Sequence, residues 1–173
     1  MSADDLTDFV WRHLERKLAQ AGAAAGPGEL RRLLSVEQLT LPGDEGGAPG
    51  ERLVRFQLAF RRGEVNVELN AHDGALMSWV FEKLAAGNGP PADPAAALAL
   101  AESAAQLGPG AVLVNAGYEE IGGRPIFVCQ WEHRQEGILV ERDYVRVLVS
   151  GESGRVFAVH RRWHTVDFIP GER

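Results

Sequence analysis

The chain has 173 residues, 45% of them hydrophobic, and a formal net charge of −6 at pH 7. This length and composition allow a packed core in one ordinary domain or two small ones. The acidic balance argues against a nucleic-acid backbone or an anionic membrane as the main partner, because phosphate binding requires a basic face. The only cysteine is Cys129, so an intrachain disulfide and a cysteine-based zinc site are excluded.

The N-terminal stretch predicts an amphipathic helix that ends at a Gly-Pro-Gly tripeptide. Ser2 is placed to cap it, with Asp5 completing a capping box. One apolar stripe follows at steps of three and four residues: Leu6, Phe9, Val10, Leu14 and Leu18. The stretch lacks the basic start and unbroken apolar run of a signal peptide, and no segment has the length of a membrane span. We therefore expect a cytoplasmic protein.

A second helix is predicted from Asp93, the expected N-cap, and Pro94, at a position where proline is tolerated. It also ends at Gly-Pro-Gly. Strand-like periodicity follows each tripeptide, and glycine-containing turns favour antiparallel hairpins. The sequences at Ile121–Arg124 and His72–Ala75 suit tight primed turns, and Glu152–Gly154 suits a longer turn with a left-handed glycine.

The same hairpin pattern occurs twice. Val65–Val80 and Val145–His160 match without a gap, each with alternating aliphatic residues, a polar turn closed by glycine, and a second apolar strand. We therefore predict an α+β fold of two tandem units, each with one helix packed on an antiparallel sheet of three to four strands. The predicted units are residues 1–86 and 93–173, joined by a linker at 87–92.

These features resemble the PepSY superfamily, whose hallmark is a final hairpin of the form V-x-V-x-x-x-x-G-x-V. The tandem order is similar to the YcdB/YcdC-type repeats of that group. The second copy carries an aromatic strand with Phe127 and Trp131, a G-I-x-V segment at 137–140, the hairpin at 145–156, and Trp163. The first copy keeps the hairpin and an aromatic residue, but lacks the G-I-x-V segment.

The resemblance implies a cystatin-like sheet wrapped on a helix and a non-catalytic role. That role is binding, or the inhibition or regulation of a peptidase or another partner. The resemblance supplies no catalytic residues. Two positions depart from the family pattern, because Asn70 and Ser150 stand where the family often has aspartate after the first hairpin strand. Members are commonly secreted or membrane-anchored, whereas this sequence shows no export signal.

The candidate binding residues lie in the second copy: Trp131, His133, Arg134, Tyr144 and His160. If Trp131 and His133 face outward, they can line a concave sheet together with the tyrosine and the second histidine. The alternative is that the aromatic residues pack in the core, as is usual for strands. No metal site is predicted, since His160 and His164 lie about 13 Å apart on a straight strand.

The leading hypothesis is a non-enzymatic binding or regulatory module that needs no cofactor. Its partner is a protein or peptide, met through a sheet face or an exposed strand edge, with a homodimer as a further possibility. One alternative is a small-molecule or enzymatic pocket in the second copy. The other is a structural subunit whose surface serves only self-association.

Overall fold

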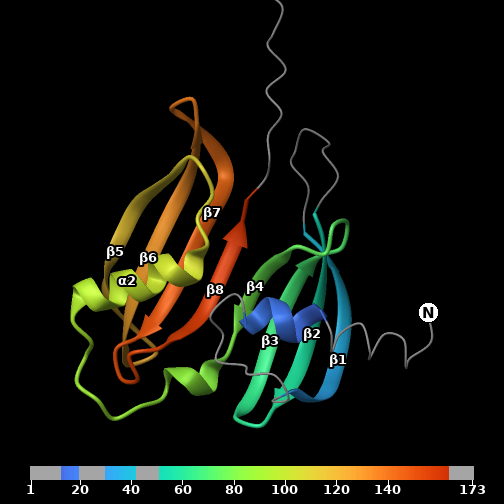
Figure 1. Cartoon of the computed structure of the whole chain (residues 1–173), viewed down its shortest axis with the longest axis horizontal. Helices are drawn as coiled ribbons and strands as arrows, with labels where there is room; N and C mark the ends of the chain where they lie inside the picture. Colours follow the sequence, from blue (N-terminus) through green and yellow to red (C-terminus); the bar gives the residue numbers. More distant parts are fainter. Residues whose placement is uncertain (1–12, 20–29, 42–50, 164–173) are drawn as a thin grey trace, which may run out of the picture.

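The computed structural model describes residues 13–19, 30–41 and 51–163 (Figure 1). Residues 13–19 are helical, α2 spans Pro94–Ala105, and a short 3-10 helix, η1, spans Glu82–Ala85. The strands are β1 (Leu30–Thr40), β2 (Arg52–Phe60), β3 (Gly63–Asn70), β4 (Leu76–Val80), β5 (Ala111–Ile121), β6 (Arg124–Gln135), β7 (Ile138–Ser150) and β8 (Val156–Arg162).

All eight strands form one antiparallel sheet in the order β1-β2-β3-β4-β8-β7-β6-β5. The prediction of an α+β fold with two tandem cystatin-like units, each with its own helix-covered sheet, is therefore wrong. Instead, β4 and β8, the last strands of the two predicted units, pair with each other. This pairing satisfies two strand edges that separate sheets would leave open. The ends of the two predicted units, at residues 86 and 93, remain a prediction.

At the centre of the sheet, β4 and β8 pair so that equivalent positions of the repeated sequence lie opposite each other or are exchanged symmetrically. Trp79 pairs with Val159, and these residues occupy equivalent places in the two matching stretches, 65–80 and 145–160. On either side, Ser78 pairs with His160 and Val80 with Ala158. An approximate two-fold axis therefore passes between Trp79 and Val159, and the repetition takes the form of symmetry within a single sheet.

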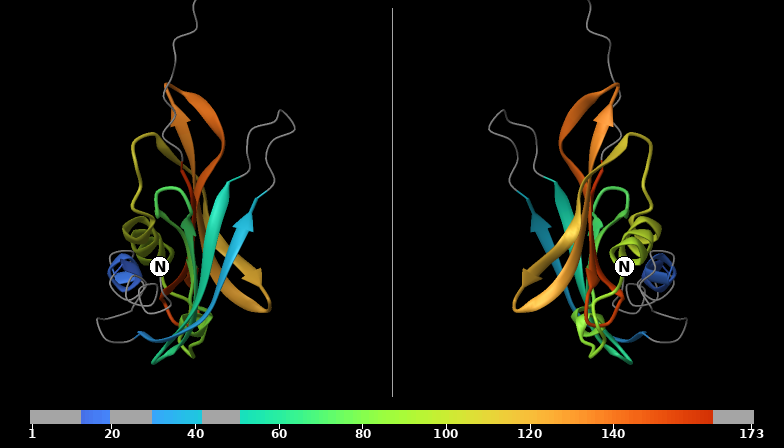
Figure 2. Two further views of the ribbon diagram at one scale, coloured as in Figure 1. Left: turned by 90° about the vertical axis from the view of Figure 1, so that its right-hand side faces the viewer. Right: turned by 90° about the vertical axis from the view of Figure 1, so that its left-hand side faces the viewer.

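Both helical segments cover the same face of this sheet (Figure 2). Under them, one row of register partners crosses every strand: Val36, Phe56, Val67, Trp79, Val159, Val147, Cys129 and Ala116. Register partners share a face, so the six inner residues of this row form the floor of the core, whereas Val36 and Ala116 at its two ends are exposed. Burial, with a smaller effect of the Glu102 charge, raises the pKa of Cys129 to about 11. Cys129 is thus a buried free thiol that packs as a small hydrophobic side chain.

The local helix signals are confirmed where the structure describes them. Leu14 and Leu18 are buried, whereas the predicted cap at Ser2 and the first Gly-Pro-Gly lie outside the described residues. The Asp93 carboxylate accepts hydrogen bonds from the amides of residues 95 and 96, and Pro94 opens α2. The cap fixes where α2 enters the sheet face, and its alanines allow close packing.

Two of the three predicted turns are confirmed. Gly122 and Gly123 both have positive φ, as a primed two-residue turn requires, and Gly154 is left-handed. At His72–Ala75 the prediction of a tight primed turn is wrong. Only Gly74 there has positive φ, and the amide of Asn70 donates to the carbonyl of Ala75 across a longer turn.

Candidate functional site

A cavity opens at the centre of the helix-covered face, and we call it the junction cavity. It encloses about 380 Å³ between helical residues 13–19, the C-terminal end of α2, and strands β4 and β8. Its walls are formed by Lys17, Ala75, Leu76, Met77, Ser78, Trp79, Ala104, Gln106, Val159, Arg161 and Trp163. Pairing between β4 and β8 ends at Ser78 and His160, so the two strands separate beside the cavity.

Two cations from distant parts of the sequence line the junction cavity. The Lys17 ammonium donates to the carbonyl of Gly74 at 2.6 Å, which holds it over the turn between β3 and β4. The Arg161 guanidinium donates to the carbonyls of Ala105 and Gln106, where α2 exposes its unsatisfied C-terminal carbonyl groups. Both side chains are thus held by the protein's own backbone while they contribute positive charge to the cavity.

Trp79, which also lines the cavity, contains a buried N–H group without an acceptor in the described part of the chain. Trp79 is fully buried, and its Nε1 has no hydrogen-bond partner among the described residues. Buried polar groups in native proteins are almost always paired, so such a group calls for an explanation. Among the described residues that line the cavity, none carries a carboxylate. The cavity therefore offers hydrogen-bond donors and positive charge next to apolar walls.

The outer wall of the cavity is held by a buried polar pair. Trp163 stacks on the His133 ring, with centroids 4.2 Å apart and an interplanar angle of 17°. His133 Nδ1 lies 2.8 Å from Asp143 Oδ2, and both residues are buried. A register shift between Glu132 and Arg134 interrupts the ladder at His133. This bulge gives His133 a supporting role behind the tryptophan.

The face without helices carries a polar row across all eight strands: Glu37, Arg55, Glu68, Ser78, His160, Arg146, Gln130 and Asn115. Arg55 and Glu68 form an ion pair at 2.7 Å. A smaller cavity of about 110 Å³ lies on this row, lined in part by Tyr144 and His160. Burial lowers the pKa of His160; Glu68 opposes the shift and Arg146 adds to it.

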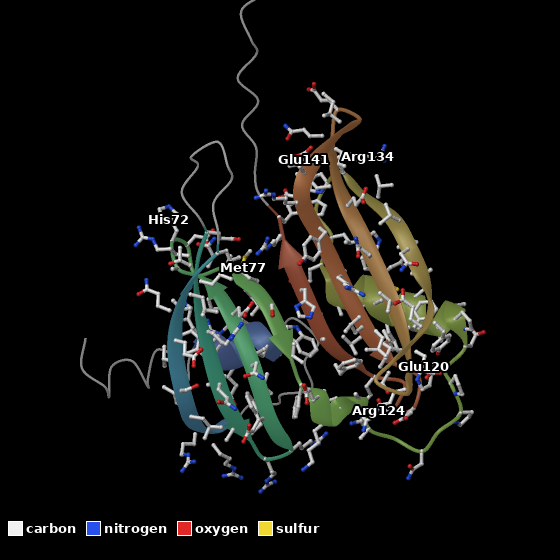
Figure 3. The ribbon with its side chains drawn as sticks, turned by 180° about the vertical axis from the view of Figure 1, so that it is seen from behind. His72, Met77, Glu120, Arg124, Arg134 and Glu141 are labelled. Carbon is white, nitrogen blue, oxygen red and sulfur yellow. The ribbon has the colours of Figure 1, made fainter. Side chains whose placement is uncertain are left out.

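The structure brings together only two of the five candidate residues predicted from sequence. Tyr144 and His160 line the smaller cavity. Trp131 is buried in the core, and His133 is buried beside Trp163. Arg134 is exposed near the tip of the β6–β7 hairpin (Figure 3). Trp131 therefore packs in the core and does not line a concave wall with the other candidate residues.

Sequence reasoning missed Lys17, Trp79 and Arg161 as members of one site. Lys17 lies on the polar side of the predicted N-terminal helix, and Arg161 lies next to Arg162 in a basic stretch that the sequence does not connect to that helix. One signal was available: the sequence has tryptophan at position 79 and valine at the equivalent position 159. A bulky residue that breaks an internal symmetry marks a place where the two copies differ.

The arrangement gives no support to hydrolytic catalysis. Glu68, Ser78 and His160 are successive register partners and have the residue types of a catalytic triad. No hydrogen bond links Ser78 to His160 within the described part of the chain. The same described residues contain no group of three side chains able to hold a metal ion.

A second candidate site is the outer edge of β5, the last strand of the sheet. Val112, Leu113 and Val114 are adjacent there and each is about 40% exposed, and we call them the edge patch. Among the described residues, no strand lies beside this edge of β5. Such an edge is a template for adding another strand.

Comparison with known proteins gives a fold likeness. No family model matches the chain, and no curated protein matches it in sequence. Among solved structures, the Bacillus megaterium YpeB C-terminal domain is similar, with a TM-score of 0.59 and 11% sequence identity. The match covers 92% of this chain and 68% of that one. At this sequence identity the likeness shows a similar fold alone. No helix within the described ranges has the length and apolar character needed to cross a membrane.

Proposed function

We propose that this protein is a non-catalytic binding module that takes up an extended peptide segment of a partner protein as an added strand along β5. The observation that carries the proposal is the edge patch on an unpaired strand edge. Main-chain hydrogen bonds give affinity in this mode of recognition, and alternate side chains give specificity. The resemblance to PepSY domains adds the hypothesis that the partner is a peptidase under regulation, met in the cytoplasm.

The two outer strands of the sheet differ in how they are protected. β1, at the other edge, carries exposed Arg31 and Arg32 beside its apolar residues. Charges of this kind deter strand addition. β5 contains no lysine, arginine or proline over its 11 residues. The contrast favours β5 as the edge that receives a partner.

Charge indicates what kind of peptide fits. The only charged residues of β5 are Glu119 and Glu120, both exposed at its C-terminal end. Asn115 donates to the Glu119 carboxylate at 3.2 Å and holds it along the strand. A matching peptide therefore presents alternating apolar residues to the edge patch and a lysine or arginine to the two glutamates.

The test selects peptides and then removes the proposed contacts one at a time. A random decapeptide library is panned against the intact protein, and the enriched peptide is synthesised with and without N-methyl groups at alternate residues. Binding is measured by fluorescence anisotropy. Leu113→Lys places a charge on the edge patch, and Val36→Lys is the matched control on β1, because the two side chains are 41% and 40% exposed.

We expect the enriched peptide to carry alternating apolar residues and a basic residue. Leu113→Lys and N-methylation each weaken its binding at least about tenfold, because both interrupt the added strand, whereas Val36→Lys has little effect. Equal binding to Leu113→Lys, or equal binding of the N-methylated peptide, would refute the proposal. A protein dimer that Leu113→Lys dissociates would replace it with self-association through β5.

A further inference from the structure

We propose that the junction cavity binds a small amphipathic carboxylate: an organic acid with one anionic group and a short apolar body. This site is separate from the β5 edge. The cavity lies over β4 and β8 at the centre of the sheet, and β5 is its outermost strand. The proposal rests on the polar groups of the cavity, on its apolar walls, and on its size.

The polar groups of the cavity select an anion. Lys17 and Arg161 supply positive charge, and Trp79, which also lines the cavity, has a buried N–H group without a partner among the described residues. All three are donors, and no carboxylate among the described lining residues balances them. The two cations bind backbone carbonyl groups, which leave their positive charge without a carboxylate among the described lining residues. A ligand carboxylate supplies the negative charge that matches Lys17 and Arg161.

Both cations are already positioned for this role. Lys17 uses one of its three N–H groups on Gly74, which leaves two for a ligand. Arg161 is fixed by the carbonyl groups at the end of α2, so its guanidinium does not have to be ordered when a ligand binds. Preorganised donors cost less entropy on binding than mobile ones.

The apolar walls and the volume limit the rest of the ligand. Leu76, Met77, Val159 and the rings of the two tryptophans form the hydrophobic surface. At about 380 Å³ the cavity lies at the small end of the range for ligand sites, roughly 300–1,000 Å³. A short aliphatic or aromatic acid fits this description, whereas a long lipid chain does not.

The first experiment uses linear carboxylates as probes and the indole N–H signals as the readout. The chain has four tryptophans, and the Trp79→Phe variant identifies which indole signal in a ¹⁵N–¹H NMR spectrum belongs to Trp79. Acetate, butyrate, hexanoate and octanoate are titrated into the intact protein. Hexanamide is the matched neutral probe, because it keeps the apolar chain and removes the charge.

We expect hexanoate to shift the Trp79 indole signal and to bind at least about tenfold more tightly than hexanamide. Affinity rises by up to about fourfold per methylene until the cavity is full. Lys17→Gln weakens hexanoate binding about tenfold and leaves hexanamide binding unchanged, which separates lost charge from a damaged fold. Arg124→Gln is the control variant, since this exposed arginine lies at the turn between β5 and β6 (Figure 3).

Any of three results would overturn the proposal. The first is that about 10 mM hexanoate, a concentration that detects even weak binding of a small ligand, does not shift the Trp79 signal. The second is equal binding of hexanoate and hexanamide, and the third is unchanged hexanoate binding in Lys17→Gln. The outcome is independent of the peptide test. We expect Leu113→Lys to weaken binding of the peptide and to leave binding of hexanoate unchanged.

Discussion

Gly110 occupies the most constrained glycine position near the candidate site, and Gly110→Ala tests the geometry around it. Its φ is +79°, which costs an L-residue about 1–2 kcal/mol. An added Cβ would lie 2.2 Å from the carbonyl oxygen of Arg134, so β6 must move. That movement breaks the 2.8 Å hydrogen bond from the Arg134 amide to the Gly110 carbonyl, worth about 1 kcal/mol. The added Cβ would also lie 3.2 Å from His133 Cδ2, a crowded contact. Together these effects should cost about 3–4 kcal/mol.

Gly122→Ala is the matched control. Gly122 also has a left-handed φ, +62°, but nothing lies within 4 Å of an added Cβ. Gly122→Ala therefore loses only about 1–2 kcal/mol, which is what a left-handed backbone conformation costs an L-residue. Urea unfolding measures both variants, and thermal unfolding should show losses of about 10 °C and about 4 °C respectively. Equal losses in the two variants would show that the close approach of Gly110 to β6 is not present in the protein.

Three further predictions concern buried polar and titratable groups. Burial lowers the pKa of His160 from its ordinary 6.5, so the folded state binds fewer protons than the unfolded state in this pH range. The stabilising contribution of this shift is fully present above about pH 6.5 and is lost as the pH falls below that value. The melting temperature should therefore drop less between pH 8 and pH 5.5 in His160→Gln than in the unmodified protein, and an equal drop would contradict this linkage. With a pKa of about 11, only about one Cys129 thiol in a thousand is ionised at pH 8, so a thiol reagent should label the native protein at the rate of unfolding; labelling at the rate of a free thiol would be the contrary result. Ser150→Ala should cost about 2–3 kcal/mol in urea unfolding, because the buried hydroxyl donates to the Ala85 carbonyl at 2.5 Å and also accepts two amide hydrogen bonds. Ser153→Ala, which loses one bond to a half-buried site, should cost about 1 kcal/mol, and the reverse order would refute the assignment.

The hairpins were predictable because their determinants are local. Asn70 and Ser150 illustrate this, since both stand where the PepSY pattern often has aspartate. Asn70 accepts a hydrogen bond from the amide two residues on through its side-chain oxygen, and Ser150 does the same. The backbone bonds that close the two turns also match in pattern and length, 2.9 Å in each case. Asparagine and serine thus perform the turn-stabilising role that an aspartate would have.

The joining of all strands into one sheet was not predictable by the same reasoning. It depends on contact between Trp79 and Val159, which lie 80 residues apart, and the strand pattern of either stretch is satisfied equally well by a separate sheet. His133 shows a related difficulty. Alternation along β6 cannot reveal the register shift beside it, so neither its burial nor its pairing with Asp143 follows from the sequence.

The single sheet also explains why the junction cavity exists. Helical residues 13–19 and α2 cover the same face, and the sheet beneath them is continuous through β4 and β8. Two helices laid over one sheet leave a space between them at its centre unless large side chains fill it. Here α2 approaches that space with Ala104, and the largest side chain on the floor, Trp79, leaves its N–H unpaired. Separate sheets would have placed Lys17 and Arg161 on different surfaces, and the symmetric pairing is what brings them to one cavity.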